Sequence, residues 1–392
     1  TRLNADGSLD PDFQSGTGGY DSIYSMVLQP DGKILLAGEF KSVLGVPRAR
    51  IARLHPNGAV DASFTSPLTE RGSIAQWIRK LALQPDGKVY MGGYFSLDAG
   101  SPRNRMARLL PNGTVDPSFT NPIDFADRPV QAIVPLPDGK VLIGGDFVSI
   151  HGESRYYLAR LHPNGLVDGS FGAGLGLNNW VTSILLLPDG KLLVAGSFTY
   201  INNIPFASLV RLLPNGAVDP EMPSGVGTDQ PIADMVSQAD GRILITGGFN
   251  IVNGVPRRGI ARLNAGLSLD AGFDIGAGAS RLYSAYINSV ALQSDGGIVI
   301  GGSFDSISGF TRYNLARLNG QFHSRLSPSL SQAAGEVGLT LFAQPGATYV
   351  LQGSTNLLDW VPVRTNTAAG NLLPFTDTTI SPHRMYRTLQ VP

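Results

Sequence analysis

The residues with the clearest chemical potential in this sequence are aspartates that recur in a repeated turn. A turn reading Gln-Pro-Asp-Gly-Lys, or a close variant, occurs six times, and each copy carries one aspartate. These aspartates are Asp31, Asp86, Asp138, Asp189, Asp240 and Asp295. A calcium site needs several oxygen ligands within one loop, whereas each of these turns supplies a single carboxylate. We therefore interpret the aspartates as turn residues that bind their own backbone, and we expect no metal or other cofactor.

A second repeated feature combines an arginine in an Ala-Arg-Leu segment with an aspartate in a Val-Asp-x-Ser-Phe segment. An arginine within a strand of a tightly packed sheet needs a charge partner, because a buried unpaired guanidinium is very costly. We predict a structural clamp in which each arginine pairs with the aspartate of its own or an adjacent copy. A ligand-binding ring of arginines is the alternative. The clamp residues are Arg53, Arg108, Arg160, Arg211, Arg262 and Arg317, with Asp61, Asp116, Asp168, Asp219 and Asp270.

Large aromatic residues occupy one position in alternate copies, nine residues before the turn aspartate. They are Trp77, Trp180 and Tyr286, where the other copies have Ser22, Pro129 and Pro231. Each ring lies where the chain is expected to enter the first strand of its copy. Exposed rings at this position could stack on sugar faces or anchor a partner protein. Packing inside a central channel is the alternative interpretation.

Catalytic motifs are absent from the sequence. It contains no Gly-x-Ser-x-Gly elbow, no phosphate-cradling loop, no His-Glu-x-x-His zinc helix and no Ser-x-Asp-x-Gly-x-x-Trp turn of the kind found in propeller sialidases. The absence of cysteine excludes disulfides, thiolate metal sites and cysteine nucleophiles. We therefore expect no catalytic residues and no enzymatic activity.

These residues belong to a repeat of about 50 residues. The turn glycines Gly32, Gly87, Gly139, Gly190, Gly241 and Gly296 are separated by 55, 52, 51, 51 and 55 residues. A phenylalanine stands eight residues after each of them, at Phe40, Phe95, Phe147, Phe198, Phe249 and Phe304. Turn residues between short aliphatic runs predict four antiparallel strands per copy, over residues 23–29, 33–40, 50–54 and 59–64 in the first copy. Four strands at this period are typical of a propeller blade.

The segments Leu-Gln-Pro-Asp-Gly-Lys, Gly-Glu-Phe, Ala-Arg-Leu and Pro-Asn-Gly-Ala-Val-Asp-Ala-Ser-Phe resemble the delta-60 repeats of bacterial propeller-like proteins. The resemblance implies an all-β fold in a large secreted or surface protein, without an established general activity. We predict a six-bladed β-propeller over residues 1–322, in which Ser8 to Phe13 completes the last blade. The extra arginine motif at Arg2 supports an alternative with seven blades, incomplete at the N-terminus.

The composition changes after about residue 321. Five short strands are expected, over residues 338–343, 348–353, 361–366, 373–377 and 385–390. The run Tyr-Val-Leu-Gln-Gly-Ser-Thr-Asn-Leu-Leu-Asp-Trp resembles small fibronectin-like C-terminal domains of secreted bacterial proteins. We therefore predict a small β-sandwich-like domain over residues 323–392, with Trp360 in its core.

Thirty basic and thirty acidic residues cancel, so no basic footprint for nucleic acid is present, and no apolar stretch is long enough for membrane insertion. We expect a noncatalytic extracellular or cell-surface scaffold or binding module, acting in adhesion, surface assembly or carbohydrate attachment. Its expected partners are other surface proteins or extracellular glycans. A secreted carbohydrate-active enzyme, or an accessory part of one, is the alternative.

Overall fold

The structure, a computed structural model, is all-β in the part of the chain that it describes. The described residues are 1–4, 7–14, 22–68, 76–97, 104–120, 129–172, 176–282, 284–318, 326–329, 337–342, 348–356, 358–369, 372–378 and 385–391. They contain no helix, and therefore none that is long and apolar enough to cross a membrane. The chain forms two compact units, Thr1–Met235 and Val236–Pro392. The predicted domain boundary between residues 322 and 323 lies outside the described residues.

Each copy of the repeat contributes three main strands. The first strands are β1 (Ile23–Leu28), β6 (Trp77–Leu83), β9 (Val130–Pro135), β14 (Val181–Leu186), β19 (Ile232–Ser237) and β25 (Tyr286–Leu292). The second strands are β2 (Ile34–Gly38), β7 (Val89–Ser96), β10 (Val141–Gly145), β15 (Leu192–Gly196), β20 (Ile243–Gly247) and β26 (Ile298–Ser303). The third strands are β5 (Ile51–Leu54), β8 (Asn104–Leu109), β13 (Leu158–Leu161), β18 (Leu209–Leu212), β23 (Ile260–Leu263) and β29 (Leu315–Leu318).

The second strand is the centre of each antiparallel sheet. The sheets of the first unit are β1-β2-β5, β6-β7-β8, β9-β10-β13 and β14-β15-β18, and β25-β26-β29 belongs to the second unit. In the second unit β20 pairs with β23, and the boundary between the two units falls within β19. The aliphatic second strands are buried on both faces, which is why they read as apolar runs and not as alternating ones.

The predicted fourth strand is much shorter than expected. Val60 makes a single antiparallel bridge to Leu54, and the same bridge recurs in the second to fifth copies. Asp61 then ends the pairing, because its carboxylate accepts the Ser63 amide while its carbonyl accepts the Phe64 amide, which together close a turn.

A short hairpin separates the second and third strands in most copies. These hairpins are β3 (Ser42–Val43) with β4 (Val46–Pro47), β11 (Ser149–Ile150) with β12 (Glu153–Ser154), β16 (Tyr200–Ile201) with β17 (Ile204–Pro205), β21 (Ile251–Val252) with β22 (Val255–Pro256), and β27 (Ser306–Ile307) with β28 (Phe310–Thr311). A further short strand, β24 (Ala279–Ser280), pairs with β27.

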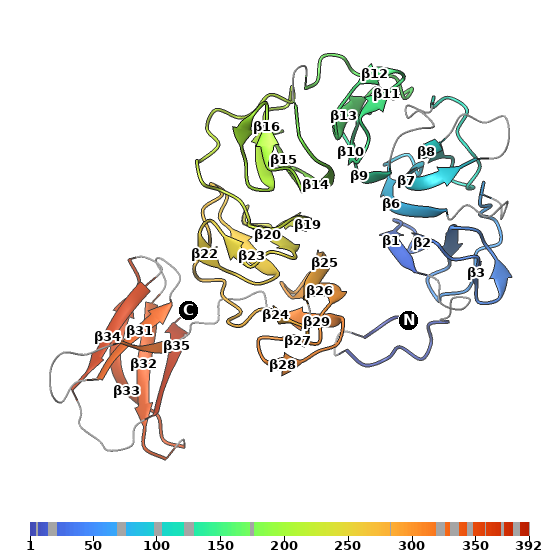
Figure 1. The fold of residues 1–392 in the computed structure, drawn as a ribbon. Helices are drawn as coiled ribbons and strands as arrows, with labels where there is room; N and C mark the ends of the chain where they lie inside the picture. Colours follow the sequence, from blue (N-terminus) through green and yellow to red (C-terminus); the bar gives the residue numbers. More distant parts are fainter. Residues whose placement is uncertain are drawn as a thin grey trace. The chain divides into compact units, whose positions relative to one another are not determined.

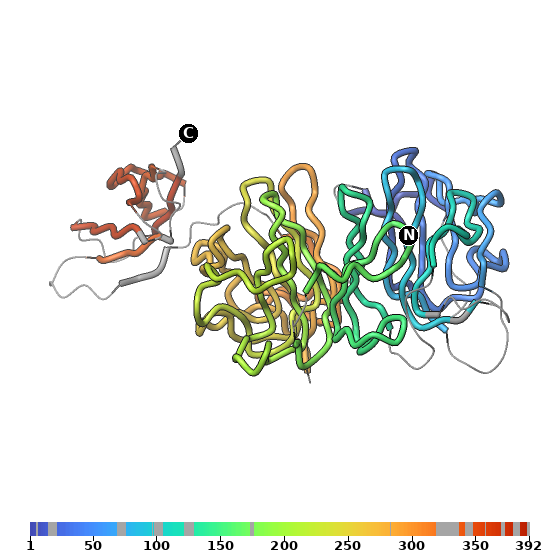
Figure 2. Tube along the Cα trace, turned by 90° about the horizontal axis from the view of Figure 1, so that it is seen from above, coloured from blue at the N-terminus to red at the C-terminus, as the bar shows by residue number. Residues whose placement is uncertain are grey.

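The repeated phenylalanines are buried in every copy. Phe40, Phe95, Phe147, Phe198, Phe249 and Phe304 are all at most 1% exposed. In the first unit, the first strands β1, β6, β9 and β14 follow one another side by side (Figure 1 and Figure 2). Apolar residues of one copy pack on the next, since Leu35 and Ala37 share a core with Ile78 and Leu81. This stacking buries both faces of the sheets, as a propeller requires.

Residues 1–14 reproduce the end of a repeat. Leu3 and Leu9 form the bridge that Leu54 and Val60 form in the first copy. Arg2 Nε donates to Asp10 Oδ2 at 2.6 Å, and the Gln14 amide donates to the Asn57 carbonyl of the first copy. Thr65 makes the same backbone contact to Asn112 of the second copy. The described residues 1–4 and 7–14 therefore reproduce the single bridge and the Arg–Asp pair that end a copy. Completion of the last blade by Ser8 to Phe13 stays a prediction.

The C-terminal strands form two sheets. β30 (Leu326–Ser329), β31 (Val337–Phe342) and β34 (Leu372–Asp377) make one sheet, and β32 (Thr348–Ser354), β33 (Val361–Thr367) and β35 (Met385–Val391) make the other. Their buried core includes Leu341, Tyr349, Leu351 and Phe375. Trp360 is not part of this core. It is half-buried, and the Arg387 guanidinium lies 4.3 Å from its ring centroid.

Candidate functional site

The repeated arginines and aspartates form ion pairs within the copies. In the second copy, Arg108 Nε donates to Asp116 Oδ2 at 2.7 Å, and the two residues are 5% and 2% exposed. Asp116 also accepts the amide and hydroxyl of Ser118, and the Lys88 ammonium lies 3.2 Å from its carboxylate. The same Nε to Oδ2 contact, at 2.6–2.8 Å, joins Arg53 to Asp61, Arg160 to Asp168, Arg211 to Asp219 and Arg262 to Asp270.

The surroundings of four clamp aspartates, Asp61, Asp116, Asp168 and Asp219, keep these carboxylates ionised. Burial alone would raise the pKa of Asp116, but hydrogen bonds from Ser118 and Arg108 outweigh it and hold that pKa well below its usual value. The same balance lowers the pKa of Asp61 and of Asp168, and it lowers the pKa of Asp219 to about 2. These carboxylates are therefore charge partners of the arginines, not proton donors at neutral pH.

The clamps of Arg53, Arg108 and Arg160 also join one copy to the next. Arg108 Nη1 donates to the Pro163 carbonyl in the third copy at 2.7 Å, and its guanidinium lies 4.9 Å from the centroid of the Phe119 ring. Equivalent hydrogen bonds run from Arg2 to Pro56, from Arg53 to Pro111 and from Arg160 to Pro214. The clamp is thus placed to hold neighbouring copies together.

Arg317 departs from this arrangement. Its side chain is 41% exposed, and it donates to Gln293 Oε1 and to Asp295 Oδ2 in the turn of its own copy. No Val-Asp segment follows Arg317 in its copy, and Gly297 stands where the other turns have a lysine or arginine. Arg317 therefore forms no buried clamp within its own copy, because that copy lacks the Val-Asp aspartate, and pairing with an aspartate of another copy stays a prediction.

The turn aspartates bind backbone. Asp31 Oδ1 accepts the Lys33 amide at 3.1 Å, and Asp86, Asp138, Asp189, Asp240 and Asp295 accept the equivalent amides. No group of three or more histidine or acidic residues capable of holding a metal ion occurs among the described residues.

Trp77 and Tyr286 begin their first strands and Trp180 immediately precedes β14, but the three residues have different surroundings. Trp77 stacks on Tyr94 with ring centroids 4.8 Å apart and an angle of 20°, and the Arg105 guanidinium lies 3.7 Å from the Tyr94 centroid. Tyr286 packs against the backbone of Gly248, where an added Cβ would lie 2.7 Å from the ring. Both rings are half-buried and contribute to packing.

Trp180 is the most open of the three, with 36% of its surface exposed. Its backbone is fixed, since its amide donates to Asn179 Oδ1 and its carbonyl accepts the Ser197 amide. A Cβ at Gly196 would lie only 2.1 Å from the Trp180 carbonyl oxygen, so the close approach of the two strands requires glycine there. Ser197 takes the position that Tyr94 has in the second copy, so the ring that stacks on Trp77 has no counterpart at that position beside Trp180.

A further group beside these rings was not singled out from the sequence. The Tyr24 hydroxyl donates to Glu39 Oε1 at 2.8 Å, and the Arg79 guanidinium lies 5.2 Å from the Tyr24 ring. Tyr24 and Arg79 stand where the register of their first strands shifts at a bulge, two residues beyond the aromatic position. Such bulges turn side chains out of the ladder. A shared offset from the turn aspartate is the sequence signal that could have found them.

The side chains near Trp77 and Tyr24 form a surface that a ligand could contact. Near Trp77 and Tyr24 it combines partly exposed rings with guanidinium groups, and burial together with Glu39 raises the pKa of Tyr24. The carboxylates whose pKa is most strongly lowered are clamp residues engaged with arginine and lysine.

A family model described as a domain of unknown function (DUF5122) beta-propeller matches six segments of the chain, which together cover more than half of it. The segments are residues 29–64, 84–119, 136–171, 187–221, 238–273 and 293–320. Each segment runs from the repeated Asp-Gly turn to the end of the clamp segment, except the last, which lacks that segment. The predicted all-β propeller fold with six repeats is thereby confirmed. A comparison with curated proteins gave no match.

The solved structures that the chain matches have low sequence identity to it and TM-scores below 0.5. A catalytically inactive virginiamycin B lyase from Staphylococcus aureus with quinupristin has 12% identity and a TM-score of 0.44, over 84% of this chain and 94% of that one. An exo-beta-1,3-galactanase from Phanerochaete chrysosporium with galactose has 12% identity and a TM-score of 0.31, over 99% and 91% of the two chains. A glycoside hydrolase has 11% identity and a TM-score of 0.30, over 95% and 82%.

Proposed function

Because the chain belongs to the DUF5122 β-propeller family, whose description names no activity, we propose its function from the most exposed of the three aromatic residues Trp77, Trp180 and Tyr286. The protein is a noncatalytic binding module at the cell surface, and it attaches to extracellular glycans through Trp180. The observation that carries this proposal is the exposed indole immediately before β14, on a backbone whose amide and carbonyl are both hydrogen-bonded.

The contrast between Trp180 and Trp77 supports this choice. The Trp77 ring is already stacked on Tyr94, whereas no aromatic partner or side-chain hydrogen bond of Trp180 occurs in the described part of the chain. A rigid, amphipathic ring offers large contact area at low entropic cost, and an indole N–H can donate to a ligand hydroxyl. Stacking on the apolar face of a pyranose uses both properties.

The scaffold supports the same proposal. The repeated clamps and phenylalanines fix the blades, so a ligand-binding ring at a strand end is held in place before it binds. The resemblance to repeats of secreted and surface proteins supports an extracellular location. The two small C-terminal sheets, over residues 326–391, are consistent with a fibronectin-like accessory domain.

Affinity electrophoresis through gels that contain β-1,3-glucan, galactan or soluble chitin derivatives tests the proposal. We expect at least one polysaccharide to retard the full chain, and Trp180→Ala to weaken that binding at least tenfold. Tyr200→Ala is the matched control, because Tyr200 is an exposed ring in the same copy, 47% exposed on β16. Absence of retardation, or equal retardation of the Trp180→Ala variant, would contradict the proposal.

A further inference from the structure

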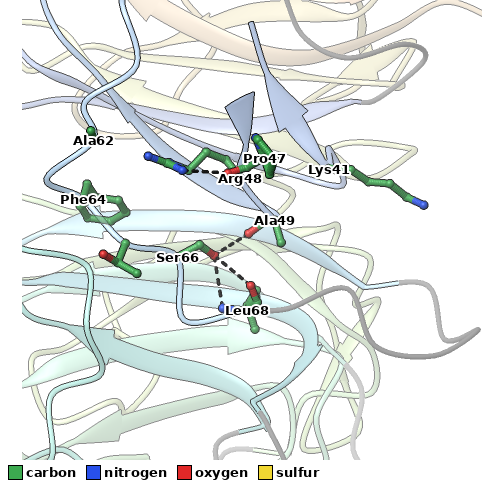
Figure 3. A pocket seen from close by; sticks show the side chains of 9 residues that line it. Lys41, Pro47, Arg48, Ala49, Ala62, Phe64, Ser66 and Leu68 are labelled. Atoms are coloured by element: carbon green, nitrogen blue, oxygen red, sulfur yellow. Dashed lines mark hydrogen bonds between the residues drawn. The ribbon is translucent and has the colours of Figure 1, made fainter. Parts of the chain in front are cut away.

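A pocket of about 390 Å³ lies in the first copy, between the β3–β4 hairpin and the segment that follows the clamp. It is lined by Lys41, Pro47, Arg48, Ala49, Ala62, Phe64, Thr65, Ser66 and Leu68. Two of these side chains are cationic and none is acidic. Figure 3 shows the Arg48 guanidinium on the side of Ala62 and Phe64, while Lys41 points away from it. The volume is within the range of small-molecule sites.

The guanidinium of Arg48 makes few hydrogen bonds to the described part of the protein. Its Nη1 donates to the adjacent Pro47 carbonyl at 2.8 Å, and its Nε is buried without a hydrogen-bond partner. No carboxylate pairs with Arg48 among the described residues. Thr65, which lines the pocket beside it, is exposed. A partly buried guanidinium without a counter-charge favours binding of an anion.

The fifth copy contains the same arginine in the same local arrangement. Arg257 Nη1 donates to the preceding Pro256 carbonyl at 2.8 Å, and Arg257 Nε is likewise buried without a partner. In that copy, however, Arg257 Nη1 also lies 3.4 Å from Asp274 Oδ2. Asp274 follows Phe273 as Thr65 follows Phe64, so Asp274 and Thr65 occupy the same position of the repeat.

The third copy satisfies its arginine in a different way. Arg155 Nη2 lies 3.0 Å from Glu153 Oε2, which belongs to the same hairpin. The corresponding hairpin residue of the first copy is the apolar Val46. The fifth copy thus pairs this arginine with Asp274, and the third copy pairs it with Glu153. The first copy has Thr65 and Val46 at these two positions, so neither supplies a carboxylate.

From this comparison within the chain, we propose that the pocket of the first copy binds a small ligand through its carboxylate. The carboxylate takes the place that the Asp274 side chain has in the fifth copy and accepts hydrogen bonds from Arg48, with the Thr65 hydroxyl at the rim. Two kinds of ligand carry such a group on a short stem: a uronic acid sugar and an acidic amino acid. The site is separate from Trp180 and does not depend on it.

Isothermal titration of the full chain with D-galacturonate, N-acetylaspartate and D-galactose tests the proposal. A ligand of this size is expected to bind with a Kd of about 1 mM. We expect one or both carboxylates to bind and galactose not to bind, and the carboxylate that binds identifies the source. Arg48→Gln should weaken binding at least tenfold. The matched control Arg155→Gln should leave it unchanged, because that guanidinium already has Glu153.

A second pair of variants tests the position without altering the arginine. Thr65→Asp places an internal carboxylate where Asp274 lies in the fifth copy, and it should abolish binding of the external one. Thr65→Asn has nearly the same shape without the charge and should retain binding within about threefold, since only the rim contact changes. Failure of both carboxylates to bind the unaltered chain, or equal binding by Thr65→Asp and Thr65→Asn, would overturn the proposal. Trp180→Ala should bind the carboxylate as the unaltered chain does.

Discussion

Removal of the clamp aspartate Asp116 is expected to destabilise the protein strongly. Asp116→Ala leaves the Arg108 guanidinium, 5% exposed, without its carboxylate, and the Lys88 ammonium and the Ser118 hydroxyl lose the same acceptor. Breaking a buried ion pair by removing one partner raises the free energy of the folded state by about 3–5 kcal/mol. Chemical denaturation at pH 7, followed by fluorescence and circular dichroism, measures the change in the free energy of unfolding.

Arg317 provides the control for this prediction. Its guanidinium meets the Asp295 carboxylate at 2.6 Å, a distance as short as that in the clamps, but the two side chains are 41% and 59% exposed. Exposed ion pairs contribute about 0–1 kcal/mol, so Arg317→Ala should change the free energy of unfolding by no more than that. If Asp116→Ala and Arg317→Ala had equal effects, burial would not be what gives the clamp its strength, and the structural interpretation of the repeat would be wrong.

Three further predictions follow from the same contacts. The lowered pKa of Asp116 means that its stabilising effect is fully present above the unfolded-state pKa of about 3.9 and is lost as the pH falls below it. The difference in unfolding free energy between the unaltered chain and Asp116→Asn should therefore be constant from pH 7 to 5 and shrink below pH 4. A constant difference down to pH 3 would contradict this. Gly196→Ala should lower the melting temperature by several degrees, because the added Cβ would lie 2.1 Å from the Trp180 carbonyl oxygen. Gly266→Ala should change the melting temperature little, because no atom lies within 4 Å of its added Cβ. Similar melting temperatures for the two variants would refute the close approach of the strands at Gly196. Trp77→Ala should reduce the free energy of unfolding by about 1 kcal/mol or more, because the stack on Tyr94 is lost, and should leave polysaccharide binding intact. Loss of binding with an unchanged free energy of unfolding would show that the binding site lies in the second copy.

The repeat made much of this architecture predictable from the sequence. Each Pro-Asp-Gly turn lies between two strands as expected, and the need to neutralise a strand arginine pointed to the aspartate that contacts it. The exposure of Arg317 is explained by the absence of a Val-Asp segment after it in its copy. This difference between the copies is visible in the sequence. The fourth strand was overestimated because Asp61 forms a turn with Ser63 and Phe64 that competes with extension of the ladder.

The differences among the three aromatic residues could not be read from their own positions. The surroundings of Trp77 depend on Tyr94, which lies 17 residues later and faces it only because β6 and β7 pair with a bulge. The ring of Tyr286 depends on the absence of a side chain at Gly248 in the preceding copy. Trp360 is expected in the core of the C-terminal domain, yet it lies half-buried beside the Arg387 guanidinium. These contacts join residues that are far apart in the sequence, so the pattern around either residue does not predict them.

The most direct test of the proposed glycan site is a fluorescence titration in which Trp180 is the sole tryptophan. The chain contains three tryptophans, so the double variant Trp77→Phe and Trp360→Phe leaves only Trp180 to report. With the polysaccharide that retards the protein in affinity electrophoresis, we expect a saturable blue shift of the emission, since a stacked sugar removes water from the indole. Emission that stays unchanged while the polysaccharide binds would show that Trp180 is not at the binding surface, and the proposed function would have to be abandoned.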